Sequence, residues 1–403
     1  MSRVSRREFL YGSAAFGAMT FGGTGLLARP KAGLPRPDHS GIKHVVVATM
    51  ENRSFDHFLG WLPGTDSVQG GVIYEDATGG AWETYTLAPD YQGCGHPDPD
   101  HSWEGGRVAY NGGACDGWMR AGNNDNFAIG YYRQEDLPFL GRAAVDWTVC
   151  SRYFSPIMAP TYPNRLYLHC GVTDRLDDSV TPSTLPTIWD RLADAGLGGT
   201  YYFSDHPFLS LWGAKYAGIT KPYAQFLADC DSGDLPEVAF VDPPFAGEQA
   251  GTSSDDHPHG DIRAGEAWLN QTYEAVTGGK DWKHTVLVIN FDEWGGFFEH
   301  MAPEEAPDVD PAFALRGFRV PCLIVSPFAR SHFIADGVYD HTSILRMIEW
   351  RWGLDPLSVR DAQANNLAGA LDFSKGGRKV PAPRYDVAPF VSPPCPGPVF
   401  SHR

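Results

Sequence analysis

Residues 285–300 read TVLVINFDEWGGFFEH, and this stretch decides the fold. Its apolar run, residues 286–289, is rich in β-branched side chains and is typical of a strand buried on both faces. The strand ends in two adjacent acids, Asp292 and Glu293, at the position where open α/β sheets bind their ligands. Because neighbouring carboxylates repel each other unless a cation joins them, the stretch predicts a site for a hard divalent ion. An acidic surface turn is the alternative.

A second stretch has the same form. Residues 44–52 read HVVVATMEN, a short buried-strand pattern that ends in Glu51 with Asn52 beside it. Asparagine at a strand end is often only a turn or cap residue. If the two strands lie in one sheet, however, their oxygen ligands converge on a single ion, and the pairing of the two stretches favours this interpretation.

Three blocks carry a resemblance to a known family. They are ENRSFDHFLG at residues 51–60, PTYPNRLYLHCG at residues 160–171 and DEWGGFFEH at residues 292–300. The blocks resemble the phosphoesterase family of bacterial acid phosphatases and phospholipases C, which includes the plant non-specific phospholipases C. The match spans residues 42–371. It implies an alkaline-phosphatase-like α/β core, with a mostly parallel sheet flanked by helices, as the alternation of strand and helix patterns also indicates.

The resemblance also implies a metal centre and a nucleophile. Thr161 stands where the family has its phosphate-accepting hydroxyl, and it lies between Pro160 and Pro163, which stiffen its backbone. Without the resemblance, Thr161 reads as a turn residue that bonds its own backbone. A divalent ion, Ca²⁺ or Mg²⁺, is expected to help make the hydroxyl a nucleophile. The expected ligands are Glu51, Asn52, Thr161, Asp292 and Glu293.

Four histidines are candidates for proton transfer or substrate contact. Phosphoryl transfer needs a proton donor for the leaving alkoxide, and histidine is the usual donor near neutral pH. One of His257, His300 and His341 is expected to fill this role. His101, in the turn-rich segment HPDPDHSW, is expected to line the pocket, although a surface loop is its alternative. The loop that holds His257 also contains Asp261, which suits a helix cap.

The N-terminus has the form of an export signal. Arg6 and Arg7 precede a weakly apolar stretch rich in Gly and Ala, so residues 1–29 read as a twin-arginine signal peptide with cleavage near Ala28. A disordered tail with a chance arginine pair is the alternative. We therefore expect a partner in the twin-arginine export machinery and a secreted, periplasmic or cell-envelope location.

The rest of the chain, residues 30–403, is expected to form a single phosphoesterase domain. Residues 61–130 read as a long loop-rich insertion, and residues from about 375 to 403 as an extended tail. The aromatic residues of the insertion, together with residues 131–140, are expected to give the pocket apolar walls.

The chain has 7 cysteines, and an exported protein is able to oxidise some of them. Within the insertion, Cys94 and Cys115 are the expected disulfide. Cys150, Cys170 and Cys322 lie in apolar runs and are expected to be buried thiols.

The formal net charge of −17 bears on partners. An acidic chain repels nucleic-acid backbones and anionic membranes, so we expect no nucleic-acid binding and at most transient contact with a membrane surface. Solubility alone also explains such acidity. A monomer is expected.

A phosphoester is the expected substrate. Phospholipase C action on phospholipid head groups is favoured over an acid phosphatase that acts on small monoesters, because the expected apolar walls suit a lipid. No substantial domain is expected after Asp372, and this expectation argues against stable membrane docking. An exported, non-catalytic binding protein on the same fold is the alternative from another class.

Overall fold

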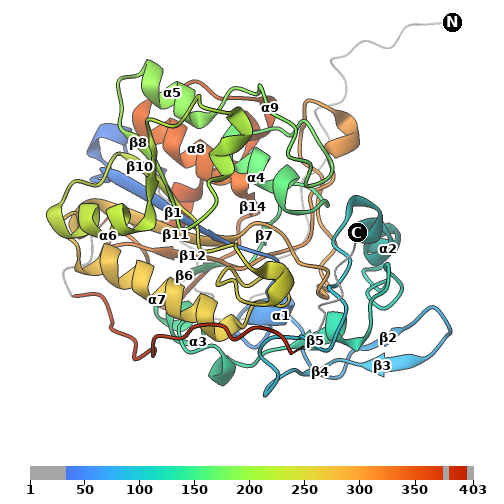
Figure 1. Ribbon diagram of the computed structural model, residues 1–403. Coiled ribbons are helices and arrows are strands. Elements are labelled where there is room, and N and C mark those ends of the chain that lie inside the picture. The colour runs from blue at the N-terminus through green and yellow to red at the C-terminus, as the bar shows by residue number, and fades with distance from the viewer. Residues whose placement is uncertain (1–32, 375–380, 397–403) are drawn as a thin grey trace, which may run out of the picture. The chain divides into compact units, whose positions relative to one another are not determined.

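The computed structural model describes residues 33–374 and 381–396. The predicted signal peptide, residues 1–29, and parts of the predicted tail lie outside these described residues. The centre of the fold is an eight-stranded sheet with the strand order β13-β6-β12-β11-β1-β10-β8-β9 (Figure 1).

The two strands expected from the sequence form the middle of this sheet. β1 (His44–Met50) pairs in parallel with β11 (Thr285–Phe291), and the register runs from His44 opposite Thr285 to Met50 opposite Phe291. All seven residues of β11 are buried, as the apolar pattern predicted. β1 also pairs in parallel with β10 (Val238–Val241). Only β12 runs antiparallel to its two neighbours in the sheet. The predicted α/β class, with a mostly parallel sheet flanked by helices, is confirmed.

Helices cover both faces of the sheet (Figure 1). α4, α5, α8 and α9 lie together on one face, and α3, α6 and α7 lie on the other. The helices are α1 (Phe55–Leu59), α2 (Trp103–Tyr110), α3 (Leu140–Asp146), α4 (Thr161–Cys170), α5 (Ile188–Asp194), α6 (Tyr223–Ser232), α7 (Ile262–Gly278), α8 (His341–Trp352) and α9 (Val359–Gln363). The remaining strands are β2 (Ile73–Glu75), β3 (Ala81–Glu83), β4 (Tyr85–Thr86), β5 (Gly130–Tyr131), β6 (Thr148–Cys150), β7 (Tyr153–Phe154), β8 (Gly199–Phe203), β9 (Thr220–Pro222), β12 (Cys322–Val325), β13 (Phe333–Ala335) and β14 (Tyr339–Asp340).

The segment 61–130 contains the short hairpin β2–β3, the strand β4 and the helix α2. α2 was not predicted, because its eight residues include two glycines, which lower the local helix propensity. Residues 381–396 of the C-terminal segment form neither helix nor strand and run alongside α7 (Figure 1).

The disulfide prediction is wrong. Cys94 bonds to Cys395, which is 301 residues away in the sequence, and Cys115 is a buried free thiol. Cysteine pairing depends on which segments meet in the fold, and the sequence does not give that information. The buried thiols predicted at Cys150, Cys170 and Cys322 are confirmed.

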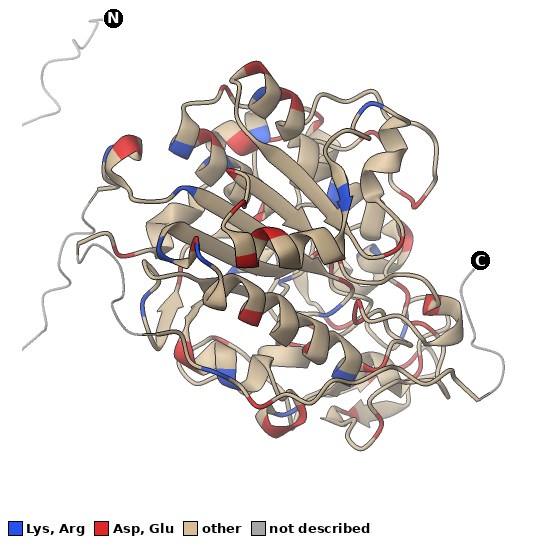
Figure 2. Ribbon diagram, turned by 60° about the vertical axis from the view of Figure 1, so that its left-hand side comes forward, with Lys and Arg blue, Asp and Glu red and all other residues tan. Residues whose placement is uncertain are grey.

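Charged residues are spread over the described part of the molecule, with acidic and basic groups interspersed (Figure 2). Within residues 33–374 and 381–396, no helix has both the length and the apolar character that crossing a bilayer requires.

Candidate active site

Three neighbouring strands end in carboxylates at one edge of the sheet. β10, β1 and β11 run in parallel side by side, so their carboxyl ends lie together. The buried acids that follow these strands are Asp242, Glu51 and Asp292. The two strand ends singled out in the sequence therefore do meet, and β10 adds a third acid that sequence reasoning did not assign to the site.

Arg165 of α4 binds all three of these acids. Its guanidinium nitrogens lie 3.3 Å from Glu51 Oε1, 3.1 Å from Asp242 Oδ2 and 3.0 Å from Asp292 Oδ2. Burial lowers the pKa of Arg165, but the three carboxylates outweigh this effect and raise it well above its usual value. The structure shows the salt bridges, and Arg165 also lines the cavity described below.

Thr161 is the first residue of α4, directly after Pro160. Its side chain is buried, and its Oγ1 lies 3.4 Å from Asn52 Oδ1. The first N–H groups of a helix have no partner inside the helix, and together with the helix dipole they favour negative charge. In α4 the N–H of Tyr162 donates to Asp178 Oδ1 at 2.7 Å, and Pro163 has no N–H, so an acid already lies at this end of the helix.

Asn52 takes a left-handed backbone conformation, with φ of 60°. Asparagine tolerates this conformation better than most residues do. Its backbone N–H donates to Asp292 Oδ1 at 3.2 Å, which joins the ends of β1 and β11. Gly295 makes the close approach possible, because a Cβ there would lie 2.0 Å from the carbonyl oxygen of Asn52. The glycine that follows the two acids therefore lets this strand end pack against its neighbour.

The carboxylates expected to bind a metal are buried. Among the described residues, the groups of acids and histidines whose ligand atoms lie close enough to share one ion are Glu51 with Glu248 and Asp255, Asp98 with His101 and His257, and Asp56 with Glu299 and His300. Glu293 is fully buried, and its Oε1 has no hydrogen-bond partner. Asp292 accepts hydrogen bonds from the backbone of Asn52 and Glu293 and from Arg165, which orients its carboxylate. Burial raises the pKa of Glu293 well above its usual range and that of Asp292 to about 6. A cation beside these oxygens would offset the cost of burying charged carboxylates, and an all-oxygen donor set suits Ca²⁺ or Mg²⁺.

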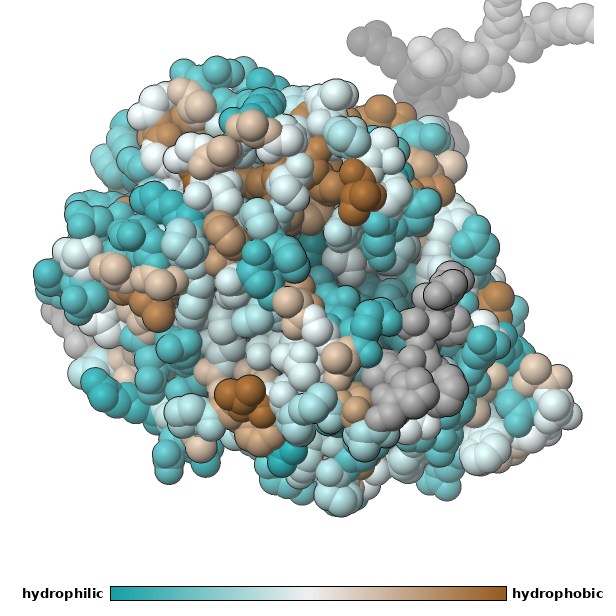
Figure 3. Space-filling model, in the orientation of Figure 1, coloured by the Kyte–Doolittle hydropathy of each residue, from teal (hydrophilic) through white to brown (hydrophobic). Residues whose placement is uncertain are grey.

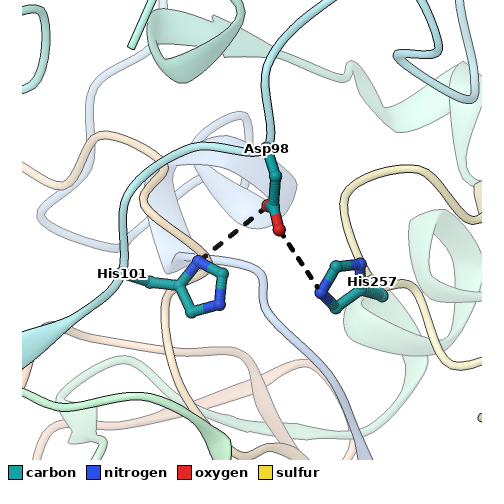
Figure 4. Close-up of side chains that lie close together, drawn as sticks. All are labelled: Asp98, His101 and His257. Carbon is teal, nitrogen blue, oxygen red and sulfur yellow. Dashed lines mark ion pairs between the residues drawn. The ribbon is translucent and has the colours of Figure 1, made fainter. Parts of the chain in front are cut away.

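His101 and His257 face each other across Asp98 (Figure 4). Asp98 Oδ1 lies 4.0 Å from His101 Nδ1, and Asp98 Oδ2 lies 3.7 Å from His257 Nε2. The other ring nitrogen of His101 lies 3.9 Å from Glu293 Oε1 and 3.4 Å from Asn52 Nδ2. Asp98 was missed as a site residue, although the sequence contained a signal for it, since it belongs to the same HPDPDHSW segment as His101.

The two histidines differ in charge. Burial lowers the pKa of His101, but the charges of Glu293 and Asp98 outweigh this effect and raise it to about 9. Burial lowers the pKa of His257 to about 4, which Asp98 only partly offsets. One imidazole is thus cationic and the other neutral near pH 7, an arrangement that suits acid–base chemistry.

His300 lies in a different cluster. Its Nδ1 lies 2.6 Å from Asp56 Oδ2, and its Nε2 lies 3.2 Å from Asp66 Oδ1. Arg319 completes the cluster by bonding to Asp56 and to Glu299. These contacts join two of the three blocks quoted from the sequence, residues 51–60 and 292–300. His300 does not line the cavity.

His341, at the start of α8, is also outside the cavity lining. Its Nε2 lies 2.8 Å from the carbonyl oxygen of Asp292, and its Nδ1 lies 3.0 Å from the Tyr153 hydroxyl. Both ring nitrogens are therefore engaged, and one of them holds the backbone of Asp292. The structure brings His101 and His257 to the cavity and places His300 and His341 in supporting networks.

A cavity of about 590 Å³ opens beside Thr161, and a hollow is visible on the face shown in Figure 3. Its size falls in the range of small-ligand sites. Of the site residues discussed above, Glu51, His101, Thr161, Arg165 and His257 line it. Its other walls include the aromatic residues Tyr162, Phe208 and Phe245, the aliphatic residues Val180 and Leu211, and the acids Asp178 and Glu248.

The expectation for the insertion needs correction. Among residues 61–140, only His101 belongs to the described residues that line this cavity. The apolar walls come instead from residues 180–211 and from Phe245. Aromatic residues of the insertion such as Trp118 are buried in a separate core cluster, where they pack against Phe318. Aromatic content alone does not distinguish a cavity wall from a core.

The chain is similar in sequence to known proteins. Its sequence matches the model of the phosphoesterase family over residues 42–355. Phospholipase C A of Mycobacterium tuberculosis (strain ATCC 25618 / H37Rv) is 28% identical over 455 residues, which cover 92% of this chain and 86% of that protein. Non-specific phospholipase C6 of Arabidopsis thaliana is 28% identical over 370 residues, which cover 81% of this chain and 71% of that protein.

Solved structures were compared as well. A protein of the alkaline phosphatase superfamily from Vibrio parahaemolyticus aligns with a TM-score of 0.40 and 10% identity, over 81% of this chain and 70% of that chain. The lipoteichoic acid synthase LtaP from Listeria monocytogenes aligns with a TM-score of 0.43 and 7% identity, over 79% of this chain and 77% of that chain. The family match covers most of the sequence and includes all three blocks. The chain therefore belongs to the phosphoesterase family and is a hydrolase that acts on phosphoric esters.

Proposed function

We propose that this chain is a phospholipase C that hydrolyses phospholipid head-group phosphodiesters, with Thr161 as its nucleophile. One observation carries the proposal: the Thr161 hydroxyl lies at the N-terminus of α4, beside Asn52 and in a cavity with both acidic and apolar walls. The relatives named phospholipase C support the choice of substrate class.

The reaction has two steps. In the first, Thr161 Oγ1 passes its proton to the neutral imidazole of His257 and attacks phosphorus in line, while the bond from phosphorus to the glycerol oxygen breaks. The leaving alkoxide takes a proton and departs as diacylglycerol, and a phosphothreonine remains. In the second step, water attacks phosphorus, the bond to Thr161 Oγ1 breaks, and the phosphorylated head group leaves. The cavity residues hold the head group so that the reacting atoms are aligned.

A divalent metal would be held by Glu51, Asn52, Thr161, Asp292 and Glu293. When bound, it supplies a positive charge that favours the ionised hydroxyl and offsets charge on the phosphoryl oxygens. Arg165, which belongs to α4, keeps Glu51 and Asp292 in place. His341 holds the backbone of Asp292 through its carbonyl oxygen.

Among the three histidines predicted as proton donors, the geometry favours His257, because it lines the cavity and has Asp98 beside its Nε2. His257, neutral at the start, takes the proton of Thr161 Oγ1 and gives it to the leaving alkoxide, then takes a proton from the attacking water and returns it to Thr161 Oγ1. His101, cationic and beside Glu293, donates a hydrogen bond to a phosphoryl oxygen. The roles predicted for His300 and His341 become supporting ones in this scheme.

The test is a pair of substrates, p-nitrophenyl phosphorylcholine and p-nitrophenyl phosphate, with wild type, Thr161→Ser and Thr161→Ala. We expect faster hydrolysis of the diester, partial activity in Thr161→Ser and loss in Thr161→Ala, with phosphate trapped on residue 161 in a rapidly quenched sample. A preference for the monoester would identify an acid phosphatase. Binding of either compound without turnover would identify a non-catalytic binding protein.

We also propose export by the twin-arginine route, on the basis of Arg6 and Arg7. Fractionation of cells that express wild type and a double Lys variant, Arg6→Lys with Arg7→Lys, tests this. Retention of the double variant in the cytoplasm is the expected result, and equal export of both forms would contradict the proposal.

A further inference from the structure

The wall of the cavity formed by residues 245–250 contacts the C-terminal segment of the chain. This wall follows β10 and contributes Phe245 and Glu248 to the cavity lining. The C-terminal segment runs alongside α7, where Tyr273 donates a hydrogen bond to the Pro383 carbonyl oxygen at 2.7 Å, and then reaches the wall (Figure 1). The cavity wall and the C-terminal segment thus meet although they are far apart in the sequence, since the bonded residues Gly251 and Ser392 are separated by 141 positions.

Five hydrogen bonds make this contact, one of them from Gln92 Nε2 to Ser392 Oγ at 3.3 Å. The backbone N–H of Cys395 donates to the Ala250 carbonyl oxygen at 2.8 Å, and Ser392 Oγ donates to the Gly251 carbonyl oxygen at 2.5 Å. Gln92 Nε2 donates to Gly251 at 2.7 Å and to the Pro393 carbonyl oxygen at 2.6 Å. Gln92 therefore joins the end of the cavity wall to the C-terminal segment with one amide group.

The disulfide fixes the same contact covalently. Cys94, two residues after Gln92, is bonded to Cys395. Gly251 lies against this bond with φ of +72°, and a Cβ there would be 2.6 Å from Cys395 Sγ and 2.8 Å from Gln92 Nε2. Only glycine combines that backbone conformation with so close an approach. The sequence thus places a glycine where the disulfide and the wall touch.

The contact reaches the other side of the site as well. Ser392 Oγ accepts a hydrogen bond of 3.1 Å from the backbone N–H of Asp261. Asp261 caps α7, and the loop before it contains His257. The C-terminal segment therefore bonds to both ends of the loop 251–261, and this loop contains His257.

We propose that Gln92 and the Cys94–Cys395 disulfide are positioning elements for the active site, which hold the 245–250 wall in place through residues 392–395. Loss of the disulfide frees the wall, and the cavity then binds substrate less tightly while the chemistry at Thr161 is preserved. A dithiol such as dithiothreitol does the same by transferring two electrons and two protons to the disulfide, which becomes two thiols. The part of the proposal that concerns substrate affinity rests on the proposed function, and the part that concerns the wall does not.

The experiment compares wild type, Gln92→Ala and the double variant Cys94→Ala with Cys395→Ala in the full chain. Amide hydrogen exchange is measured for peptides covering residues 245–252, together with kcat and KM for p-nitrophenyl phosphorylcholine. We expect exchange at 245–252 to become roughly tenfold faster or more in both variants. KM is expected to rise about threefold or more while kcat changes less than about twofold. Dithiothreitol is expected to reproduce these effects in wild type and to add nothing in the double variant.

Cys115→Ala and Tyr385→Phe are the controls. Cys115 is a buried free thiol in the same insertion, and the Tyr385 hydroxyl bonds Asp146 away from the wall. Both controls should leave exchange at 245–252 unchanged. If the double variant does not fold, Gly251→Ala and reduction of the native protein test the same contact. Unchanged exchange at 245–252 after reduction and in Gln92→Ala would overturn the proposal. Faster exchange in a protein that hydrolyses no phosphoester would instead refute the proposed function alone.

Discussion

Arg165 Nε donates to Asp292 Oδ2 at 3.0 Å, although the two residues are 127 positions apart in the sequence. Arg165 lies four residues after Thr161 in α4, and side chains with that spacing share one face of a helix. The guanidinium that binds the strand-end carboxylates thereby also fixes the helix that begins with the proposed nucleophile. The three acids and the hydroxyl become one rigid unit.

Replacing Arg165 with Ala should lower the free energy of unfolding by about 3–5 kcal/mol, because it leaves buried carboxylates without their partner. The measurement is urea unfolding followed by circular dichroism, in the presence of a chelator so that a metal does not take the place of the guanidinium. Arg120→Ala removes a more exposed pair with Asp116 and should cost less than about 1 kcal/mol. Equal effects of the two substitutions would contradict this view of Arg165.

His257 and His259 offer a matched comparison, since both lie in one loop but only His257 lines the cavity. His259 Nε2 instead lies 3.1 Å from the His96 carbonyl oxygen. We expect His257→Gln to lower kcat on the phosphodiester about 10²-fold, the usual contribution of a positioned acid or base. His259→Gln should change kcat less than about threefold. A larger loss in the His259 variant would show that the cavity does not identify the proton donor.

The stability contributed by His300 should depend on pH in a defined direction. Burial lowers its pKa, but the hydrogen bond and charge of Asp56, with Glu299, outweigh this effect and raise it to about 9. A group whose pKa is raised in the folded state stabilises fully below its unfolded value, about 6.5, and loses that contribution as the pH rises through about 9.

The comparison of wild type with His300→Gln should therefore show a larger difference in unfolding free energy at pH 6 than at pH 10. The difference at pH 6 is expected to be on the order of 1–3 kcal/mol, because the side chain is partly exposed. Denaturant unfolding at both pH values measures it. A difference that grows toward pH 10 would show that the cationic form is not the stabilising one.

Removal of bound metal should abolish hydrolysis and lower the melting temperature, because an ion that binds only the folded state stabilises it. An ion present at about 100 times its Kd adds about 2.7 kcal/mol. Dialysis against a chelator, followed by addition of Ca²⁺ or Mg²⁺ separately, measures the loss and the recovery by scanning calorimetry and by activity.

Glu293→Gln is the matched variant, because it keeps the shape of the side chain and removes the negative charge of the carboxylate. The Oε1 atom of that carboxylate has no hydrogen-bond partner. Its melting temperature should no longer respond to either ion. A response equal to that of wild type would place the ion elsewhere in the molecule.

The local parts of this description could be predicted from the sequence. The apolar, β-branched run before Asp292 specifies a buried strand by its own composition, and the strand ends where the two acids begin. The expectation that the ends of β1 and β11 meet followed from the shared form of the two stretches, each a short apolar run that ends in oxygen ligands, and their parallel pairing agrees with it.

Only the tertiary structure decided which distant residues share a site. Three contacts join segments whose neighbours in the fold the sequence does not reveal. Asp98 lies between His101 and His257, Asp242 joins the acids around Arg165, and Cys94 is bonded to Cys395. It also divided the histidines, because His257 lines a cavity, whereas His300 lies in the cluster with Asp56 and Arg319. Local patterns set what each segment can form, whereas the order of strands in the sheet sets which side chains meet, and that order depends on the packing of the whole chain.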